Sequence, residues 1–108
     1  MKESAKDSLR ITNQFRAKDA MVYDLRCEGT RLTVSVSQRR NEQDPAEWCV
    51  AARSGAAPND VTVEEWGPSA AKALEKIATS WGTRRESEAI PSFDWTAVAA
   101  ALAAVRAI

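Results

Sequence analysis

The chain has 108 residues, of which 44% are hydrophobic and 28% charged, and this is the size and composition of one globular domain that can bury a core without disulfides or metal ions. Its 15 basic and 15 acidic residues cancel, so the charge balance gives no support to a nucleic acid or an anionic membrane as partner. The absence of histidine removes the commonest general base and metal ligand, and we therefore expect no enzyme activity, no cofactor and no metal site.

The sequence predicts no targeting or membrane segment. Residues 1–20 are polar and charged, without the apolar stretch of a signal peptide, and we expect residues 1–8 to be frayed. The longest apolar run, Val98 to Val105, is too short to cross a bilayer. We expect a cytoplasmic protein whose two cysteines are reduced thiols.

Residues 5–19 fit two secondary structures. Leu9, Ile11 and Phe15 are separated by polar residues as in a strand, but Asn13 interrupts the alternation. Good helix formers flank the segment on both sides and favour a helix. A short N-terminal helix is therefore our expectation, with a strand as the alternative.

The next residues predict a β-hairpin. Apolar and polar side chains alternate from Met21 to Glu28 and again from Leu32 to Ser37, which is typical of two strands with one buried face. Gly29 between them supplies a tight turn with a positive φ. Hydroxyl and charged side chains on the other face indicate that one side of the sheet meets water.

Two further strands are predicted, over residues 48–53 and 61–66. Each follows a loop, 39–46 or 54–60, that contains proline. Strands that follow one another through short loops favour an antiparallel meander, here of three to four strands.

An amphipathic helix is predicted near Pro68 to Trp81. The proline suits a first helical turn, Ser69 is a capable N-cap, and apolar residues then recur at helical spacing. Gly82 is the expected stop.

A polar connection, residues 83–92, leads to a last helix near Phe93 to Ala107. Either Ser92 or Asp94 starts this helix. The expected fold is thus α+β, with the antiparallel sheet covered on one face by two C-terminal helices.

Trp66 is the first candidate binding residue. Trp48, Trp81 and Trp95 fit apolar stripes, which indicates core positions. Trp66 instead has strand parity opposite to Val61 and lies at a strand end, so it is either a partly exposed interface anchor or packed beneath the last helix.

Two arginine pairs are the second candidate. Arg39 with Arg40, and Arg84 with Arg85, would hold phosphate if their two loops lay at one end of the fold. Neighbouring acidic residues offer a simpler interpretation, in which both loops are locally neutral and exposed.

One stretch resembles a known family. The β-β-β-α order, with a Gly-x-Ser entry at residues 67–69 into an alanine-rich helix, is similar to double-stranded-RNA-binding domains and to related antitoxin half-folds. The resemblance implies a first helix before Met21 and RNA binding by lysines at the start of the later helix. Of these lysines the chain has Lys72 and Lys76.

These observations predict a non-enzymatic interaction module that acts through protein–protein contact or self-association. A two-fold dimer through a sheet edge or the last helix is one form of it. A nucleic-acid-binding module that uses the two arginine pairs is the alternative, and a small-ligand carrier or enzyme with a pocket between sheet and helices is the second alternative.

Overall fold

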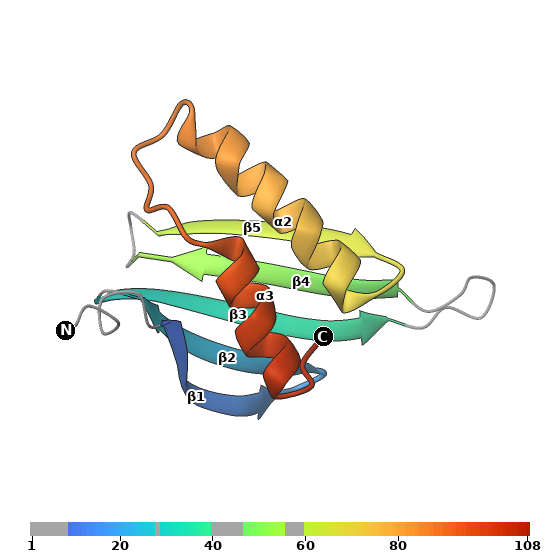
Figure 1. Cartoon of the computed structure of the whole chain (residues 1–108). Helices are drawn as coiled ribbons and strands as arrows, with labels where there is room; N and C mark the ends of the chain where they lie inside the picture. The colour runs from blue at the N-terminus through green and yellow to red at the C-terminus, as the bar shows by residue number, and fades with distance from the viewer. Residues whose placement is uncertain (1–8, 28, 40–46, 56–59) are drawn as a thin grey trace.

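A computed structural model describes residues 9–27, 29–39, 47–55 and 60–108. It contains a five-stranded antiparallel sheet in the order β1-β2-β3-β4-β5, with two helices on one face (Figure 1). The elements are β1 (Leu9–Ala17), β2 (Ala20–Cys27), β3 (Thr30–Arg39), β4 (Glu47–Ser54), β5 (Val61–Gly67), α2 (Ala70–Arg85) and α3 (Trp95–Ala104). The α+β class and the two C-terminal helices are confirmed, and the sheet has five strands rather than three to four.

The additional strand is β1, in the segment where we expected a helix. It pairs antiparallel with β2, and the register shifts between Ile11 and Asn13, which leaves Thr12 in a bulge. Beyond the bulge every residue to Ala17 is exposed, so this half of the strand has no buried face. The expected N-terminal helix was wrong because the bulge breaks the alternation that identifies a strand. Residues 1–8, expected to be frayed, lie outside the described residues.

The predicted hairpin is present as β2 and β3. Cys27 lies opposite Thr30, and Gly29 adopts a φ of 84°, as the tight turn requires. The same alternation continues through β4 and β5, where Val50 and Val63 are buried on the helix side. One face of all five strands therefore faces the helices.

The first predicted helix is longer than expected. Ser69 is its N-cap and accepts a hydrogen bond from the backbone N–H of Lys72 at 3.2 Å. Gly82 does not stop it: α2 continues to Arg85, three residues further. The last turn gains from its arginines, because cations are favoured at a helix C-terminus.

The connection between the helices covers residues 86–94 rather than 83–92, because α2 ends later and α3 begins later than expected. Asp94 is the N-cap of α3 and accepts a hydrogen bond from Ala97 N–H at 3.1 Å, which decides between the two expected starts. α2 packs on β4 and β5, and α3 crosses the other half of the sheet toward β1 (Figure 1).

The core lies between the sheet and the two helices. Its fully buried large side chains come from both layers: Trp81, Leu25, Leu32, Ile77, Leu102, Val34, Val50 and Val98. Trp48 and Trp95 are half-buried and pack against this core, as their spacing predicted. No helix in the described ranges is long and apolar enough to span a membrane.

Candidate functional site

The face of the sheet away from α2 and α3 is the candidate site, because no described helix covers it. We call it the open face. Strand alternation and register assign to it the following residues: Arg10, Asn13, Phe15, Val22, Asp24, Arg26, Arg31, Thr33, Ser35, Ser37, Cys49, Ala51, Arg53, Thr62, Glu64 and Trp66.

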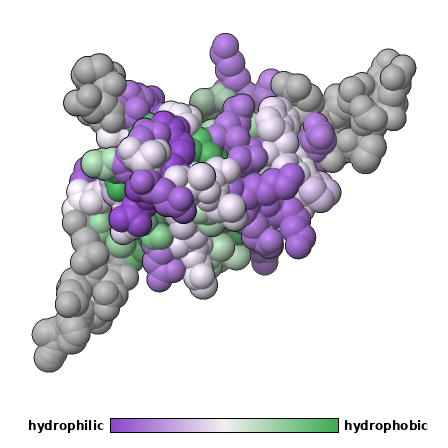
Figure 2. Space-filling model, turned by 90° about the horizontal axis from the view of Figure 1, so that it is seen from above, coloured by the Kyte–Doolittle hydropathy of each residue, from purple (hydrophilic) through white to green (hydrophobic). Residues whose placement is uncertain are grey.

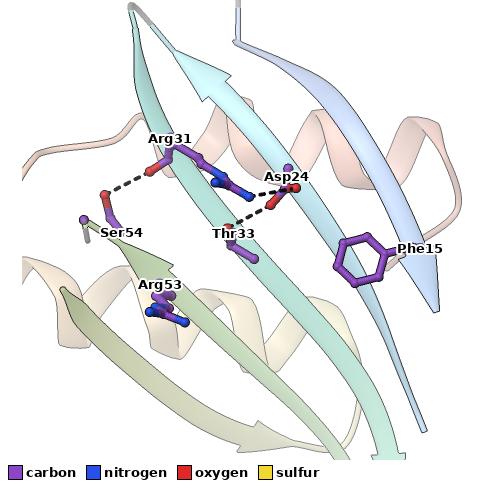
Figure 3. A pocket seen from close by; sticks show the side chains of 7 residues that line it. Phe15, Asp24, Arg31, Thr33, Arg53 and Ser54 are labelled. Atoms are coloured by element: carbon purple, nitrogen blue, oxygen red, sulfur yellow. Dashed lines mark hydrogen bonds and ion pairs between the residues drawn. The ribbon is translucent and has the colours of Figure 1, made fainter. Parts of the chain in front are cut away.

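At one end of the open face, a hollow of about 370 Å³ surrounds a buried carboxylate (Figure 3). Asp24 is only 7% exposed. Its Oδ1 accepts a hydrogen bond from Thr33 Oγ1 at 2.9 Å, and its Oδ2 accepts one from Arg31 Nη2 at 3.1 Å. Phe15 also lines this hollow, and its side chain is 45% exposed.

A row of three arginines crosses the strands at the same end. Arg10 lies directly opposite Arg26, and Arg26 lies directly opposite Arg31. Opposed side chains in an antiparallel sheet are close neighbours, so three cations here repel one another. Arg53 follows on β4 and forms an ion pair with Asp60 at 3.0 Å.

The centre of the open face carries small side chains between larger ones. One cross-strand row consists of Phe15, Val22, Ser35, Ala51 and Glu64. The next row pairs Ser37 with Cys49 and Cys49 with Trp66. We call these two rows the central rows. Their residues on β3 and β4 are small, whereas Phe15 on β1 and Trp66 on β5 are aromatic and belong to different rows.

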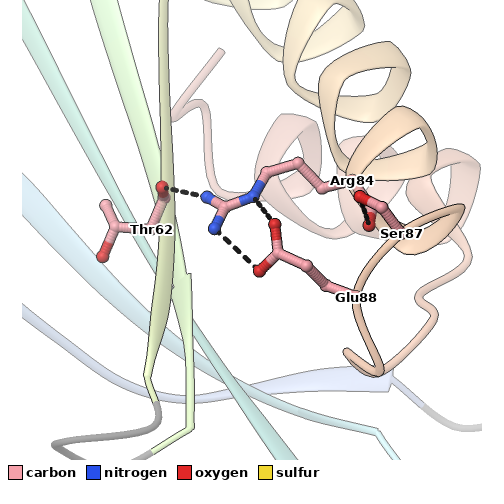
Figure 4. Close-up of polar contacts among 4 residues, drawn as sticks. All are labelled: Thr62, Arg84, Ser87 and Glu88. Atoms are coloured by element: carbon pink, nitrogen blue, oxygen red, sulfur yellow. Dashed lines mark hydrogen bonds and ion pairs between the residues drawn. The ribbon is translucent and has the colours of Figure 1, made fainter.

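The outer edge of β5 is covered by side chains from α2. Lys76 Nζ donates to the Trp66 carbonyl at 2.8 Å, and Arg84 Nη1 donates to the Thr62 carbonyl at 3.1 Å (Figure 4). Arg84 is itself held by Glu88 through two hydrogen bonds of 2.9 and 3.0 Å. Covering an edge strand with side chains of a helix opposes its pairing with another strand, so this edge is protected.

The Arg84–Glu88 pair predicts a pH dependence of stability. Hydrogen bonds from Arg84 hold the pKa of Glu88 below its ordinary value of 4.5. A carboxyl whose pKa is lower in the folded state stabilises the fold above its unfolded-state pKa, and it loses this contribution as the pH falls through the folded pKa. We therefore expect Glu88→Gln to lower the melting temperature slightly at neutral pH, with the difference vanishing as the pH falls below 4.5.

Thermal unfolding followed by circular dichroism at several pH values measures this. Glu86→Gln is the matched control, because Glu86 is exposed and its side chain has no ion pair with another described residue. Equal pH profiles for the two variants would contradict the assignment.

The predicted binding residues lie in different places. Trp66 is half-buried and lies on the open face. It is therefore partly exposed, as one of the two expectations had it, and is not packed beneath the last helix. Its binding role stays a prediction.

The two arginine pairs are not brought together. Arg39 ends β3 opposite Glu47, near the end of β5, whereas Arg84 contacts Thr62 near the beginning of β5. Arg84 and Arg85 lie in the last turn of α2 rather than in a loop, and Arg85 Nε donates to the Ile90 carbonyl at 3.2 Å. Arg40 lies outside the described residues. Phosphate binding by either pair stays a prediction.

Sequence reasoning missed Asp24 and the arginine row. Part of this arrangement could have been predicted from the hairpin. A turn that sets Cys27 opposite Thr30 also sets Arg26 opposite Arg31 and Asp24 opposite Thr33. The position of Arg10 needed β1, which the sequence did not identify as a strand.

In the described part of the chain, no three cysteine, aspartate or glutamate side chains converge as a metal site would require. Cys49 is buried and Cys27 half-buried, and neither forms a disulfide.

The first helix implied by the resemblance to double-stranded-RNA-binding domains is absent, since Leu9–Ala17 is a strand. The order of elements in this chain is five strands followed by two helices. No family model matches the chain, and neither a curated protein nor a solved structure shows significant similarity to it.

Proposed function

We propose that this protein is a non-enzymatic interaction module of the cytoplasm that binds a partner protein on the open face of its sheet. The observation that carries the proposal is the face itself, which no described helix covers and on which the small side chains of Ser35 and Ala51 share one row with Phe15 on β1 and Glu64 on β5. A 45% exposed Phe15 and a half-buried Trp66 are the kinds of side chain that anchor protein interfaces.

Both edges of the sheet are protected against pairing with another strand, and this favours binding through the open face over edge-to-edge association. The β5 edge is covered by Lys76 and Arg84. The β1 edge has a bulge at Thr12 and carries Arg10 and Arg16, and both features oppose pairing with a further strand. Figure 2, which looks from the side where Figure 1 draws α2 and β5, shows mainly hydrophilic residues there.

Ser35→Arg tests the proposal, because an arginine on the central strand of the open face blocks contact with a partner. We expect tagged protein to recover a partner from native lysate, and Ser35→Arg to recover about tenfold less, as the loss of a central contact would cause. Thr79→Arg is the matched control: it adds the same charge at an exposed position of α2 and should recover the partner normally.

Both variants must give the circular dichroism spectrum of the native protein. Recovery of the same partner by all three proteins, or of none by the native protein, would contradict the proposal.

A further inference from the structure

The arginine row carries an electrostatic cost to stability. Like charges directly opposite one another in a sheet are destabilising, and Arg10, Arg26 and Arg31 occupy three successive strands in this relation. Arg10 and Arg26 are both exposed, and Arg26 contacts only its own turn, through Nη1 to the Gly29 carbonyl at 3.3 Å, among the described residues. The guanidinium groups of Arg10 and Arg26 are therefore accessible to an anionic ligand.

Counted over the described residues, the charge at this end of the open face is positive although the chain as a whole is neutral. Arg31 is paired with Asp24, and Arg53 with Asp60, whereas Arg10 and Arg26 have no carboxylate partner among the described residues. The side chains of Arg31 and Arg53 are 60% and 55% exposed, so their guanidinium groups remain accessible to a second anion. This end of the open face therefore attracts negative charge.

We infer that the partner presents an acidic segment with interspersed apolar side chains, whose carboxylates pair with the arginine row and whose apolar side chains contact Phe15. Guanidinium groups bind carboxylates through paired hydrogen bonds, and Phe15 lines the same hollow as Asp24 and Arg31 (Figure 3). The inference rests on the proposed function, because it names the chemistry of the partner at the same face.

A nucleic acid suits this face less well. Asp24 lies within the hollow and Glu64 lies on β5 of the same face, and both would repel a phosphate backbone. An acidic peptide can place its carboxylates at the arginines only and leave apolar side chains elsewhere. Tighter binding of a nucleic acid than of an acidic peptide would therefore contradict the inference.

The experiment uses a fluorescein-labelled peptide of alternating glutamate and valine, its glutamine counterpart, and a labelled single-stranded RNA, each titrated with the full chain. We expect the acidic peptide to bind more tightly than both other probes, and its affinity to fall when NaCl is raised from about 0.05 M to about 0.5 M. In Arg10→Gln/Arg26→Gln the affinity should fall about tenfold, as expected for the loss of two ion pairs of up to ~1 kcal/mol each.

Lys72→Gln/Arg106→Gln is the matched control, since it removes two exposed positive charges outside the open face and should bind normally. The arginine variant should also melt at the same or a higher temperature, because it removes the opposed charges, so weaker binding would not reflect unfolding.

No binding of the acidic peptide, equal loss in both double variants, or tighter binding of the RNA would overturn the inference. The proposed function fails separately, through the Ser35→Arg capture experiment. If Ser35→Arg abolishes capture while the acidic peptide does not bind, the open face binds a partner of other chemistry.

Discussion

Trp81→Ala is expected to lower the free energy of unfolding by about 3–5 kcal/mol, the largest effect of any single substitution considered. Trp81 has no exposed surface and joins three parts of the helical layer. Its ring lies 5.7 Å from that of Phe93 and 5.6 Å from that of Trp95, both edge-on, and its Nε1 donates to the Pro91 carbonyl at 2.7 Å. Alanine would leave a cavity and remove the hydrogen bond together.

The loss would be a large part of the total for a domain of this size, whose stability is typically about 5–15 kcal/mol. Urea unfolding followed by far-ultraviolet circular dichroism measures it without relying on the fluorescence of the substituted residue. Trp81→Phe is the intermediate variant, since it keeps an aromatic ring and loses only the hydrogen bond and part of the volume. A loss below about 1 kcal/mol for Trp81→Ala would show that α3 and the preceding connection do not depend on this contact.

The helical layer was largely predictable because its signals are local. Ser69 as N-cap and the 3.6-residue apolar spacing predicted α2, and both are features of neighbouring residues. Gly82 misled the prediction because glycine lowers helix propensity by only about 1 kcal/mol, and contacts of the following residues can exceed this. Arg84 makes such contacts with Glu88 and with the Thr62 carbonyl of β5.

The fifth strand was missed for a different reason. A strand is recognised by one buried face, and beyond the bulge at Thr12 β1 has none. Its backbone pairing with β2 holds it in place, and that pairing depends on residues distant in sequence. The helix propensity of the flanking residues favoured a helix in this segment. Pairing of β1 with β2 outweighs that propensity in the folded protein.

The site was less predictable than the fold. The sequence places Asp24 on the polar face of its strand, from which solvent exposure is the natural expectation. Its burial arises from Thr33 and Arg31 of the neighbouring strand, so it depends on the register of the hairpin and on the length of the arginine side chain. Trp66 could be recognised by parity alone, since both Val61 and Val63 of its strand are buried.

Asp24→Ala is expected to have the second largest effect on stability, a loss of about 2 kcal/mol. The carboxylate is 7% exposed and accepts hydrogen bonds from Thr33 Oγ1 at 2.9 Å and Arg31 Nη2 at 3.1 Å. Alanine leaves the Thr33 hydroxyl without its acceptor in a half-buried position. The Arg31 contact contributes less than its distance suggests, because that side chain is 60% exposed and water screens the pair.

Thr33→Val and Arg31→Gln separate the two contacts in urea unfolding experiments. We expect Thr33→Val to show most of the stability loss of Asp24→Ala. The coupling free energy between Asp24→Ala and Arg31→Gln should be below about 1 kcal/mol. An Asp24→Ala protein as stable as the native chain would show that the carboxylate is not a structural group of the sheet.

Removal of the Asp24 charge should act in the opposite direction on binding. Asp24 neutralises part of the charge of Arg31, so its removal leaves Arg31 available to an acidic ligand. We expect Asp24→Asn, which keeps the size and part of the hydrogen bonding, to bind the acidic peptide about two- to fivefold more tightly at low salt and equally at high salt. A variant with lower stability and higher affinity would show that Asp24 acts differently on folding and on binding. If Asp24 supported only the fold, its substitution would lower both the stability and the affinity.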